Sequence, residues 1–368
     1  MKITRISVYQ ADITVARGGY AVSRGRIVRE VDTTVVLIDT DAGTTGIGES
    51  CPMGTDYLPA FPGGVRAGIE LIGPALLGVD PRELATVNRI MDTVLLGHPY
   101  VKNGIDMACW DILGKASGVP LYKLLGGMLN EGPRARIGLS AAPADEMARM
   151  LAERQAQGFN HFSAKVGDDP DADIERLNQI CAALKPGQTV VADANRGWTV
   201  HGALRVCQGI GHLNSIYIEQ PCDTYEECLL VRRAAPQPMI LDECIDTIPS
   251  FMRAWCDKAL DGVNIKTARH GGVSRTRQLR DLCNTLGISV YIQDVWGTAI
   301  SASAIAHLAA STPPELFLGI WDPMGWNESD VATGGPEMRN GRYFASDRPG
   351  LGVEPMMEIL GEPIAIYE

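Results

Sequence analysis

Hydrophobic and polar positions along the first fifty residues predict an antiparallel sheet. Residues 3–9 alternate apolar and polar side chains, and residues 34–38 are rich in β-branched side chains, so both segments are typical of strands. The turn sequence Asp41-Ala42-Gly43 separates the second strand from a third over residues 45–49. Between residues 65 and 130, apolar positions recur at helical spacing, as in 68–72 and 105–113. This half of the pattern predicts a sheet followed by a helical bundle.

A different rhythm begins at about residue 135, where a short apolar strand precedes a helical stretch every 23 to 28 residues. Strands that alternate with helices predict parallel βαβ units, and eight such units in one domain is the number found in a TIM barrel. The predicted strands are residues 136–141, 161–166, 189–195, 215–220, 238–243, 262–267, 288–294 and 316–321. A doubly wound open sheet is the alternative. It usually carries a glycine-rich phosphate-binding turn after its first strand, and Gly138-Leu139-Ser140 is not such a turn.

Two flanking segments complete this pattern. Residues 15–26 contain three glycines and are suited to a hinged lid over the barrel. Beyond the last predicted strand, the piece Gly341-Arg342-Tyr343-Phe344 is strand-like, and we expect it to rejoin the N-terminal sheet.

Charge and cysteine content narrow the class of partner. The 368 residues include 33 basic and 44 acidic side chains, and a net charge of −11 argues against binding to nucleic acid or to an acidic membrane surface. Nowhere do eighteen apolar residues follow one another, and the first residues lack the apolar stretch of a secretory signal. Nine scattered cysteines without a C-x-x-C pair are typical of reduced thiols. We therefore expect a cytoplasmic protein that acts on a small molecule.

Three carboxylates stand at the ends of consecutive predicted strands. Asp193, Glu219 and Asp242 are separated by 26 and 23 residues, and catalytic groups in a barrel sit at the C-terminal ends of strands. Three unpaired anions at one mouth would repel one another, so the group requires a cation. Oxygen ligands without a histidine suit Mg²⁺ or Mn²⁺ better than Zn²⁺. The alternative is that each acid caps a helix or faces solvent.

Two lysines flank these acids, because Lys165 ends the second predicted strand and Lys266 ends the sixth. Alternation along the second strand places Ser163 on the same face as Lys165. An amine close to a divalent cation and another amine should have a lowered pKa and could act as a base. Two lysines on opposite faces of a substrate could remove a proton from one face and deliver one to the other. The alternative is that they only form salt bridges with the acids.

Four segments around these residues carry a resemblance to a known family. They are Val191-Ala192-Asp193-Ala194-Asn195, Tyr217-Ile218-Glu219-Gln220-Pro221, Leu241-Asp242-Glu243 and Val263-Asn264-Ile265-Lys266. In this order and spacing they resemble the enolase superfamily, and the two lysines resemble its muconate lactonizing subgroup. The resemblance implies an α/β fold with an α+β capping domain over residues 1–130. It further implies a modified TIM barrel, (β/α)₇β, over 131–325, and a C-terminal segment, 326–368, that returns to the cap.

The resemblance also implies a chemistry. Members of this superfamily bind a substrate carboxylate on Mg²⁺, remove the α-proton and stabilise the resulting enediolate, and a lysine base beside Mg²⁺ is an established pattern among them. Negative charge that develops on oxygen must be met by preorganised positive charge. By this match Asp193, Glu219 and Asp242 are metal ligands, and Lys165 and Lys266 are the acid and base residues.

Departures from the family pattern restrict the expected reaction. Ser163 stands where many members of the subgroup have the first lysine of a Lys-x-Lys pair, which disfavours cycloisomerase and succinylbenzoate synthase activity. Residues 319–323 lack the Asp-x-Asp of dipeptide epimerases, and residues 293–297 lack the histidine of sugar-acid dehydratases and mandelate racemase. What remains resembles the branch that acts on proline derivatives, through Cys51-Pro52, Tyr57-Leu58-Pro59 and Asp294-Val295-Trp296-Gly297.

The function that this branch implies is dehydration of cis-3-hydroxy-L-proline to Δ1-pyrroline-2-carboxylate. Racemisation of proline betaine, or 2-epimerisation of 4-hydroxyproline betaine, is the alternative. The expected contacts with the proline-derived substrate are Tyr57, Ser163, Asn195, Asp294 and Trp296. Tyr57 would lie against the ring, and Asp294 or Trp296 would meet the ammonium group by charge or by a cation–π contact. Since the family is commonly oligomeric, we expect a homo-oligomer.

Overall fold

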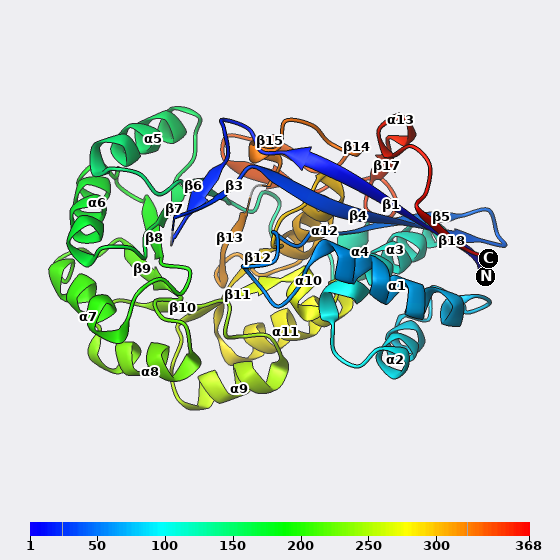
Figure 1. Ribbon diagram of the computed structural model, residues 1–368, viewed down its shortest axis with the longest axis horizontal. Coiled ribbons are helices and arrows are strands. Elements are labelled where there is room, and N and C mark those ends of the chain that lie inside the picture. The colour runs from blue at the N-terminus through cyan, green and yellow to red at the C-terminus, as the bar shows by residue number, and fades with distance from the viewer. Residues whose placement is uncertain (24, 322) are drawn as a thin grey trace.

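The computed structural model of the chain describes residues 1–23, 25–321 and 323–368. Arg24, in the predicted lid, and Asp322, after the last predicted strand, lie outside the described residues. Figure 1 shows a barrel surrounded by helices α5 to α9 at one end of the molecule, and a sheet with helices α1 to α3 at the other. Both chain ends lie at the outer edge of that sheet. None of the described helices combines the length and the apolar character needed to cross a membrane.

The capping domain is built on an antiparallel sheet, as predicted. Its strand order is β18-β1-β4-β5, with β1 (Ile3–Thr14), β4 (Glu30–Thr40), β5 (Thr45–Ser50) and β18 (Ala365–Tyr367). Four helices follow β5: α1 (Pro62–Leu76), α2 (Leu84–Val94), α3 (Pro99–Ser117) and α4 (Leu121–Leu124). A Cβ atom at Gly48 would lie 1.9 Å from the carbonyl oxygen of Gly104. Only glycine therefore lets α3 lie directly on β5.

Eight parallel strands of the described chain close into a barrel in the order β10-β11-β12-β13-β6-β7-β8-β9. They are β6 (Ala135–Leu139), β7 (His161–Lys165), β8 (Thr189–Asp193), β9 (Ile216–Glu219), β10 (Met239–Leu241), β11 (Gly262–Lys266), β12 (Ser289–Gln293) and β13 (Phe317–Trp321). The predicted barrel is thus confirmed, and an open doubly wound sheet is excluded. Inside, Val191, Ile240, Tyr291 and Leu318 form an apolar cluster of their own, so the barrel is filled below its mouth.

Helices follow the barrel strands and cover the barrel from outside, except for the short α10 (Thr267–His270), which lies at the mouth directly after β11. They are α5 (Ala144–Ala156), α6 (Pro170–Ala182), α7 (Val200–Gly209), α8 (Tyr225–Ala234), α9 (Ile248–Cys256), α10, α11 (Val273–Leu286) and α12 (Ala299–Ala310). Several begin at a side chain that accepts a hydrogen bond from the first helical turn, such as Thr224 in α8 and Thr247 in α9. Outward-facing strand residues such as Phe162 and Ala164 are fully buried in the main core.

The C-terminal segment corrects one prediction. Its elements are η1 (Met324–Trp326), β14 (Ala332–Gly334), β15 (Glu337–Arg339), β16 (Arg342–Phe344), β17 (Val353–Pro355) and α13 (Met357–Leu360). The strand over 342–344 pairs with β15 and does not rejoin the N-terminal sheet, because Tyr343 is buried and its N–H donates to Pro133 O, just before β6. The piece that rejoins the sheet is β18, which pairs with β1.

The predicted lid segment forms a hairpin of β2 (Tyr20–Val22) and β3 (Arg26–Val28). Its base is held to the C-terminal segment, since Ala16 N donates to Trp326 O at 2.7 Å and Val15 bridges to Asn327. At its tip, the Ser23 hydroxyl donates to Asn195 O at 3.4 Å, in the loop after β8. The hairpin therefore reaches across the carboxyl ends of the barrel strands.

A buried carboxylate joins the capping domain to the barrel. Glu49, at the end of β5, is fully buried and accepts hydrogen bonds from Thr33 Oγ1 at 2.7 Å, Thr298 N at 3.0 Å and Ser301 N at 3.0 Å. The last two donors belong to the first turn of α12, where a negative charge also meets the positive end of the helix dipole.

We expect Glu49→Gln to lower the free energy of unfolding by about 2 kcal/mol, because an amide cannot accept all these bonds and buried N–H groups lose their partner. Urea denaturation measures the change. The control is Glu358→Gln at an exposed position of α13, which should leave stability unchanged. A Glu49→Gln variant as stable as the wild type would show that α12 does not depend on this carboxylate.

Candidate active site

Five predicted residues meet at the carboxyl ends of five neighbouring barrel strands. Lys165 ends β7, Asp193 ends β8, Glu219 ends β9, Asp242 follows β10 and Lys266 ends β11. None of them is more than 7% exposed. The three acids occupy consecutive strands and the two lysines stand on either side of them, because residues at the ends of parallel strands share one rim of a barrel.

Each lysine forms an ion pair with the nearest acid. Lys165 Nζ lies 2.5 Å from Asp193 Oδ2 and donates to Asn195 Oδ1 at 2.9 Å. Lys266 Nζ lies 2.6 Å from Asp242 Oδ2 and also donates to the hydroxyl of Tyr57. The protein alone therefore supplies counter-charges at Asp193 and Asp242, through the salt bridges that the sequence analysis held as the alternative role of the lysines.

Two arginines that the sequence analysis missed add to these charges. Arg136, on β6, lies inside the barrel with Nη1 2.7 Å from Glu219 Oε2 and Nη2 3.5 Å from Asp193 Oδ2. Arg269, on α10, pairs with Asp242. Arg136 was detectable as a charged side chain within a predicted barrel strand. Nothing in the sequence pattern distinguishes Arg269.

The surroundings shift the pKa values of Glu219 and Asp242 in opposite directions. Burial, reinforced by the charges of Asp193 and Asp242, raises the pKa of Glu219 to about 7, although Arg136 opposes the shift. Burial also acts to raise the pKa of Asp242, but Lys266 and Arg269 outweigh it and hold that pKa below its usual range. At this rim, Glu219 therefore has a pKa near neutral pH, whereas the neighbouring Asp242 stays ionised.

The surroundings of Lys165 in the protein alone differ from those that the sequence analysis assumed. Burial alone would lower the pKa of this lysine, but the charge of Asp193, the interaction with Tyr20 and the hydrogen bond to Asp193 together outweigh burial and raise the pKa above its ordinary value. The expected lowering assumed a divalent cation at the acids, and the charges of the protein alone have the opposite effect. A neutral Lys165 therefore requires that Asp193 engage another positive charge.

The residues at this rim fit a hard divalent cation. No three His, Cys, Asp or Glu side chains in the described residues form a ready-made metal site, since Asp193 and Asp242 are engaged by lysines. Glu219 lies between them with one oxygen, Oε1, bonded to Asn264 Nδ2 at 2.7 Å. Its buried Oε2 approaches Arg136 but accepts no hydrogen bond from any described residue. Carboxylate oxygens from three consecutive strands are the donor set that Mg²⁺ or Mn²⁺ prefers.

Four of the five expected substrate contacts line one small cavity with the two lysines. Tyr57, Asn195, Asp294 and Trp296 surround a space of about 40 Å³ at the barrel mouth. Ser163 is buried on β7 below it and does not line it. The hairpin, through Tyr20 and Val22, and the loop after β5, through Met53 and Tyr57, close this space in. A substrate in the mouth would therefore contact both covering segments.

Asp294 is fully engaged by protein donors. It accepts hydrogen bonds from Thr267 Oγ1 at 2.5 Å, Ala268 N at 3.0 Å and Val295 N at 2.8 Å, and burial raises its pKa to about 6. These bonds hold the first residues of α10, which directly follow Lys266. Contact between Asp294 and a substrate ammonium group stays a prediction.

Trp296 contributes an aromatic wall. Its Nε1 donates to Asn327 Oδ1 at 2.9 Å, and its ring packs against Tyr20 and Trp321 at centroid distances of 5.9 and 6.3 Å. Tyr20, Tyr57 and Trp321 line the same cavity. The mouth therefore presents aromatic faces opposite the carboxylates, the arrangement that a cation–π contact needs.

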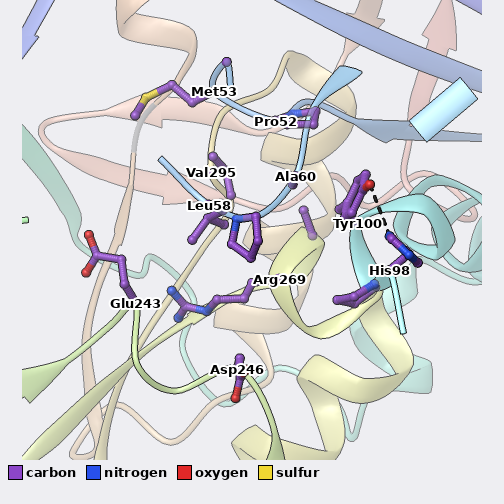
Figure 2. Close-up of a pocket in the computed structure, with 14 residues that line it drawn as sticks. Pro52, Met53, Leu58, Ala60, His98, Tyr100, Glu243, Asp246, Arg269 and Val295 are labelled. Carbon is purple, nitrogen blue, oxygen red and sulfur yellow. Dashed lines mark hydrogen bonds between the residues drawn. The ribbon is translucent and has the colours of Figure 1, made fainter. Parts of the chain in front are cut away.

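A larger cavity of about 280 Å³ lies beside the mouth and does not hold the lysines. Figure 2 shows Pro52, Leu58 and Ala60 of the loop after β5 on one side of it, with His98 and Tyr100 at the start of α3 on another. Met53 and Val295 line both cavities. A shift of this loop would therefore join them.

Comparison with known proteins agrees with this geometry. Residues 6–126 match the family model for the mandelate racemase / muconate lactonizing enzyme N-terminal domain, and residues 146–359 match the enolase C-terminal domain-like model. A cis-3-hydroxy-L-proline dehydratase of Roseibium aggregatum is 44% identical over 367 residues, covering all of both chains. An N-succinyl-L-Arg/Lys racemase of Bacillus cereus is 27% identical over 98% of both chains.

Among solved structures, a member of the enolase superfamily from Roseovarius nubinhibens ISM, complexed with magnesium, superposes with a TM-score of 0.94. It is 42% identical, and the match covers 100% of this chain and 99% of that one. Since the two family models cover most of the sequence and the barrel and cap agree with them, the chain belongs to the mandelate racemase and muconate lactonizing enzyme group of the enolase superfamily.

Proposed function

We propose that this protein is a Mg²⁺-dependent dehydratase that converts cis-3-hydroxy-L-proline to Δ1-pyrroline-2-carboxylate. The observation that carries the proposal is the pair of buried lysines, Lys165 and Lys266, on opposite sides of three carboxylates. Similarity over the whole chain to a cis-3-hydroxy-L-proline dehydratase supports the choice of substrate. Mn²⁺ is a second candidate for the metal, because it accepts the same oxygen ligands.

The stereochemistry of this substrate requires functional groups on both ring faces. Its hydroxyl lies on the same face as the carboxylate, and therefore on the face opposite the hydrogen of Cα. A base on one face must take the Cα proton, while an acid on the other protonates the departing hydroxide. Lysines on β7 and β11, separated by three strands of the barrel, meet this requirement.

The reaction then needs one neutral and one protonated lysine. A divalent cation on Asp193, Glu219 and Asp242 would supply positive charge for the substrate carboxylate and compete with the lysines for the same oxygens. The neutral amine accepts the Cα proton, the bond from C3 to oxygen breaks, and the ammonium group of the other lysine gives its proton to the leaving hydroxide. Water and an enamine result, and the enamine tautomerises to the cyclic ketimine.

One observation favours a second candidate, 2-epimerisation of a proline betaine. Tyr20, Tyr57, Trp296 and Trp321 line the mouth, and aromatic faces bind quaternary ammonium groups well. The first step would be the same removal of the Cα proton, and the opposite lysine would then return a proton to Cα.

Incubation of the Mg²⁺-loaded enzyme with cis-3-hydroxy-L-proline in D₂O, followed by NMR, tests the proposal. We expect signals of the ketimine to replace those of the substrate. The matched control is trans-3-hydroxy-L-proline, whose hydroxyl shares a face with the Cα hydrogen and which should react much more slowly. Exchange or inversion at Cα without any ketimine would overturn the dehydratase proposal and favour the epimerase.

A further inference from the structure

Tyr20 lines the mouth cavity and carries a buried hydroxyl group that no described residue binds. It lies on the first strand of the lid hairpin, is 2% exposed and lines the mouth cavity. Its ring packs against Trp326 and Trp321 at centroid distances of 4.5 and 5.4 Å, and Lys165 Nζ lies 5.7 Å from its centroid. The ring is thus held firmly beside one of the two lysines.

The tyrosine hydroxyl is buried without a hydrogen-bond partner in the described chain. A buried polar group without a partner costs about 1–3 kcal/mol, so its retention indicates a partner that is absent from the protein itself. Burial raises the pKa of Tyr20 to about 12, which keeps the hydroxyl protonated and able to donate.

Gly138 on β6 makes room for this hydroxyl. A Cβ atom at Gly138 would lie 2.4 Å from Tyr20 Oη, well inside contact distance. Its neighbours Ile137 and Leu139 face the outer core, so the missing side chain at 138 would point into the barrel. Gly138 also pairs in register with Ser163 on β7, whose buried Oγ likewise has no hydrogen-bond partner among the described residues.

The position of Tyr20 in the ring of strands indicates which part of a substrate it meets. The carboxylate ligands stand on β8, β9 and β10, and β6 lies across the barrel from β10. A substrate whose carboxylate is held at the acids therefore extends its ring toward β6, β12 and β13. On the Lys266 side, the hydroxyl of Tyr57 is already bonded to Lys266 and Asp242. The Lys165 side has unused hydroxyl groups, those of Tyr20 and Ser163.

We propose that the Tyr20 hydroxyl donates a hydrogen bond to the 3-hydroxyl oxygen of the substrate on the Lys165 side, and so selects for hydroxylated prolines. The proposal rests on the proposed function and deepens it. It places the leaving hydroxide beside Lys165, so that Lys266 faces the Cα hydrogen on the opposite side of the ring.

The test is Tyr20→Phe, which keeps the ring and removes the hydroxyl alone. We expect kcat/KM for cis-3-hydroxy-L-proline to fall about 30-fold, in line with the loss of one hydrogen bond that strengthens in the transition state. The inhibition constant of L-proline should stay within about twofold of the wild-type value. L-Proline has no 3-hydroxyl for Tyr20 to bond in the wild type, and the variant has no Tyr20 hydroxyl. Tyr367→Phe on β18, outside the barrel, is the matched control and should change neither constant.

The role of Tyr20 would be overturned if kcat/KM for cis-3-hydroxy-L-proline and the affinity for L-proline fell equally, or if neither fell. If Tyr20→Phe does not fold by circular dichroism, Gly138→Ala serves instead, since its methyl group would lie 2.4 Å from Tyr20 Oη and must displace that hydroxyl; the loss should again be larger for cis-3-hydroxy-L-proline than for L-proline. Absence of ketimine formation by the wild-type enzyme would be a failure of the proposed function. Even in that case, competition between cis-3-hydroxy-L-proline and L-proline would still measure whether the variant selectively loses binding of the hydroxylated ligand.

Discussion

Lys266→Ala should abolish both the dehydration of cis-3-hydroxy-L-proline and the exchange of its Cα proton with D₂O, each by on the order of 10³-fold. Lys165→Ala should abolish dehydration to a similar extent but retain Cα exchange. The reason is the division of roles proposed from the position of Tyr20, in which Lys266 would remove the Cα proton and Lys165 would protonate hydroxide on the other face.

NMR in D₂O follows both quantities in one sample, because loss of the Cα–H signal relative to the other signals of the remaining substrate reports exchange, and the ketimine signals report dehydration. Lys185→Ala, at an exposed position, is the control for a lost surface lysine and should behave as the wild type. The reverse pattern, with exchange kept only in Lys266→Ala, would place the leaving group beside Lys266. Full turnover in either catalytic variant would exclude the paired-lysine mechanism altogether.

Glu219→Gln should have the second large effect. The substitution keeps the size of the side chain and leaves an Oε1 acceptor for Asn264, but it removes the negative charge between Asp193 and Asp242. We expect the affinity for Mg²⁺ to fall by more than about 100-fold and turnover at fixed Mg²⁺ by on the order of 10³-fold, since the substrate carboxylate loses its counter-charge. Isothermal titration with Mg²⁺ measures the binding independently of activity.

The matched control is Glu243→Gln, one strand further round the rim. Burial raises the pKa of Glu243, and its Oε1 accepts a hydrogen bond from Asn195 at 3.1 Å, yet it is not among the expected ligands. This variant should bind Mg²⁺ within about tenfold of the wild type. In the wild type, EDTA should abolish activity and excess Mg²⁺ should restore it. Unchanged Mg²⁺ affinity in Glu219→Gln would remove this residue from the metal site.

The barrel was predictable because its strands repeat at nearly constant spacing, and because a period of two shows which side chains face inward. The same reasoning placed Asp193, Glu219 and Asp242 together, since parallel strands end at one rim. Contacts between distant segments were not accessible to it. The strand over 342–344 was identified, but its partner was predicted wrongly, because strand propensity does not specify pairing.

The electrostatic surroundings of the site residues could not be predicted from the sequence either. The lowered lysine pKa was inferred from a cation and a second amine, whereas Asp193 Oδ2 lies 2.5 Å from Lys165 Nζ and acts to raise the pKa of that lysine in the protein. Arg269 pairs with Asp242 from α10, a helix that sequence spacing does not relate to the acids, whereas Arg136 lies on a predicted barrel strand and was given no role there. The contact between Tyr20 and Gly138 was not predictable for the same reason, because the two residues come together only when the hairpin folds over the barrel.

The small volume of the mouth cavity, about 40 Å³, has a consequence for the fate of the products. Elimination creates two molecules from one, and both products would share this space while the hairpin and the loop after β5 are closed. Water and enamine would thus stay in contact, and readdition would compete with escape until the covering loops part. Opening toward the larger cavity at Met53 and Val295 would make the reaction irreversible in practice, so loop motion would act as the commitment step of the cycle.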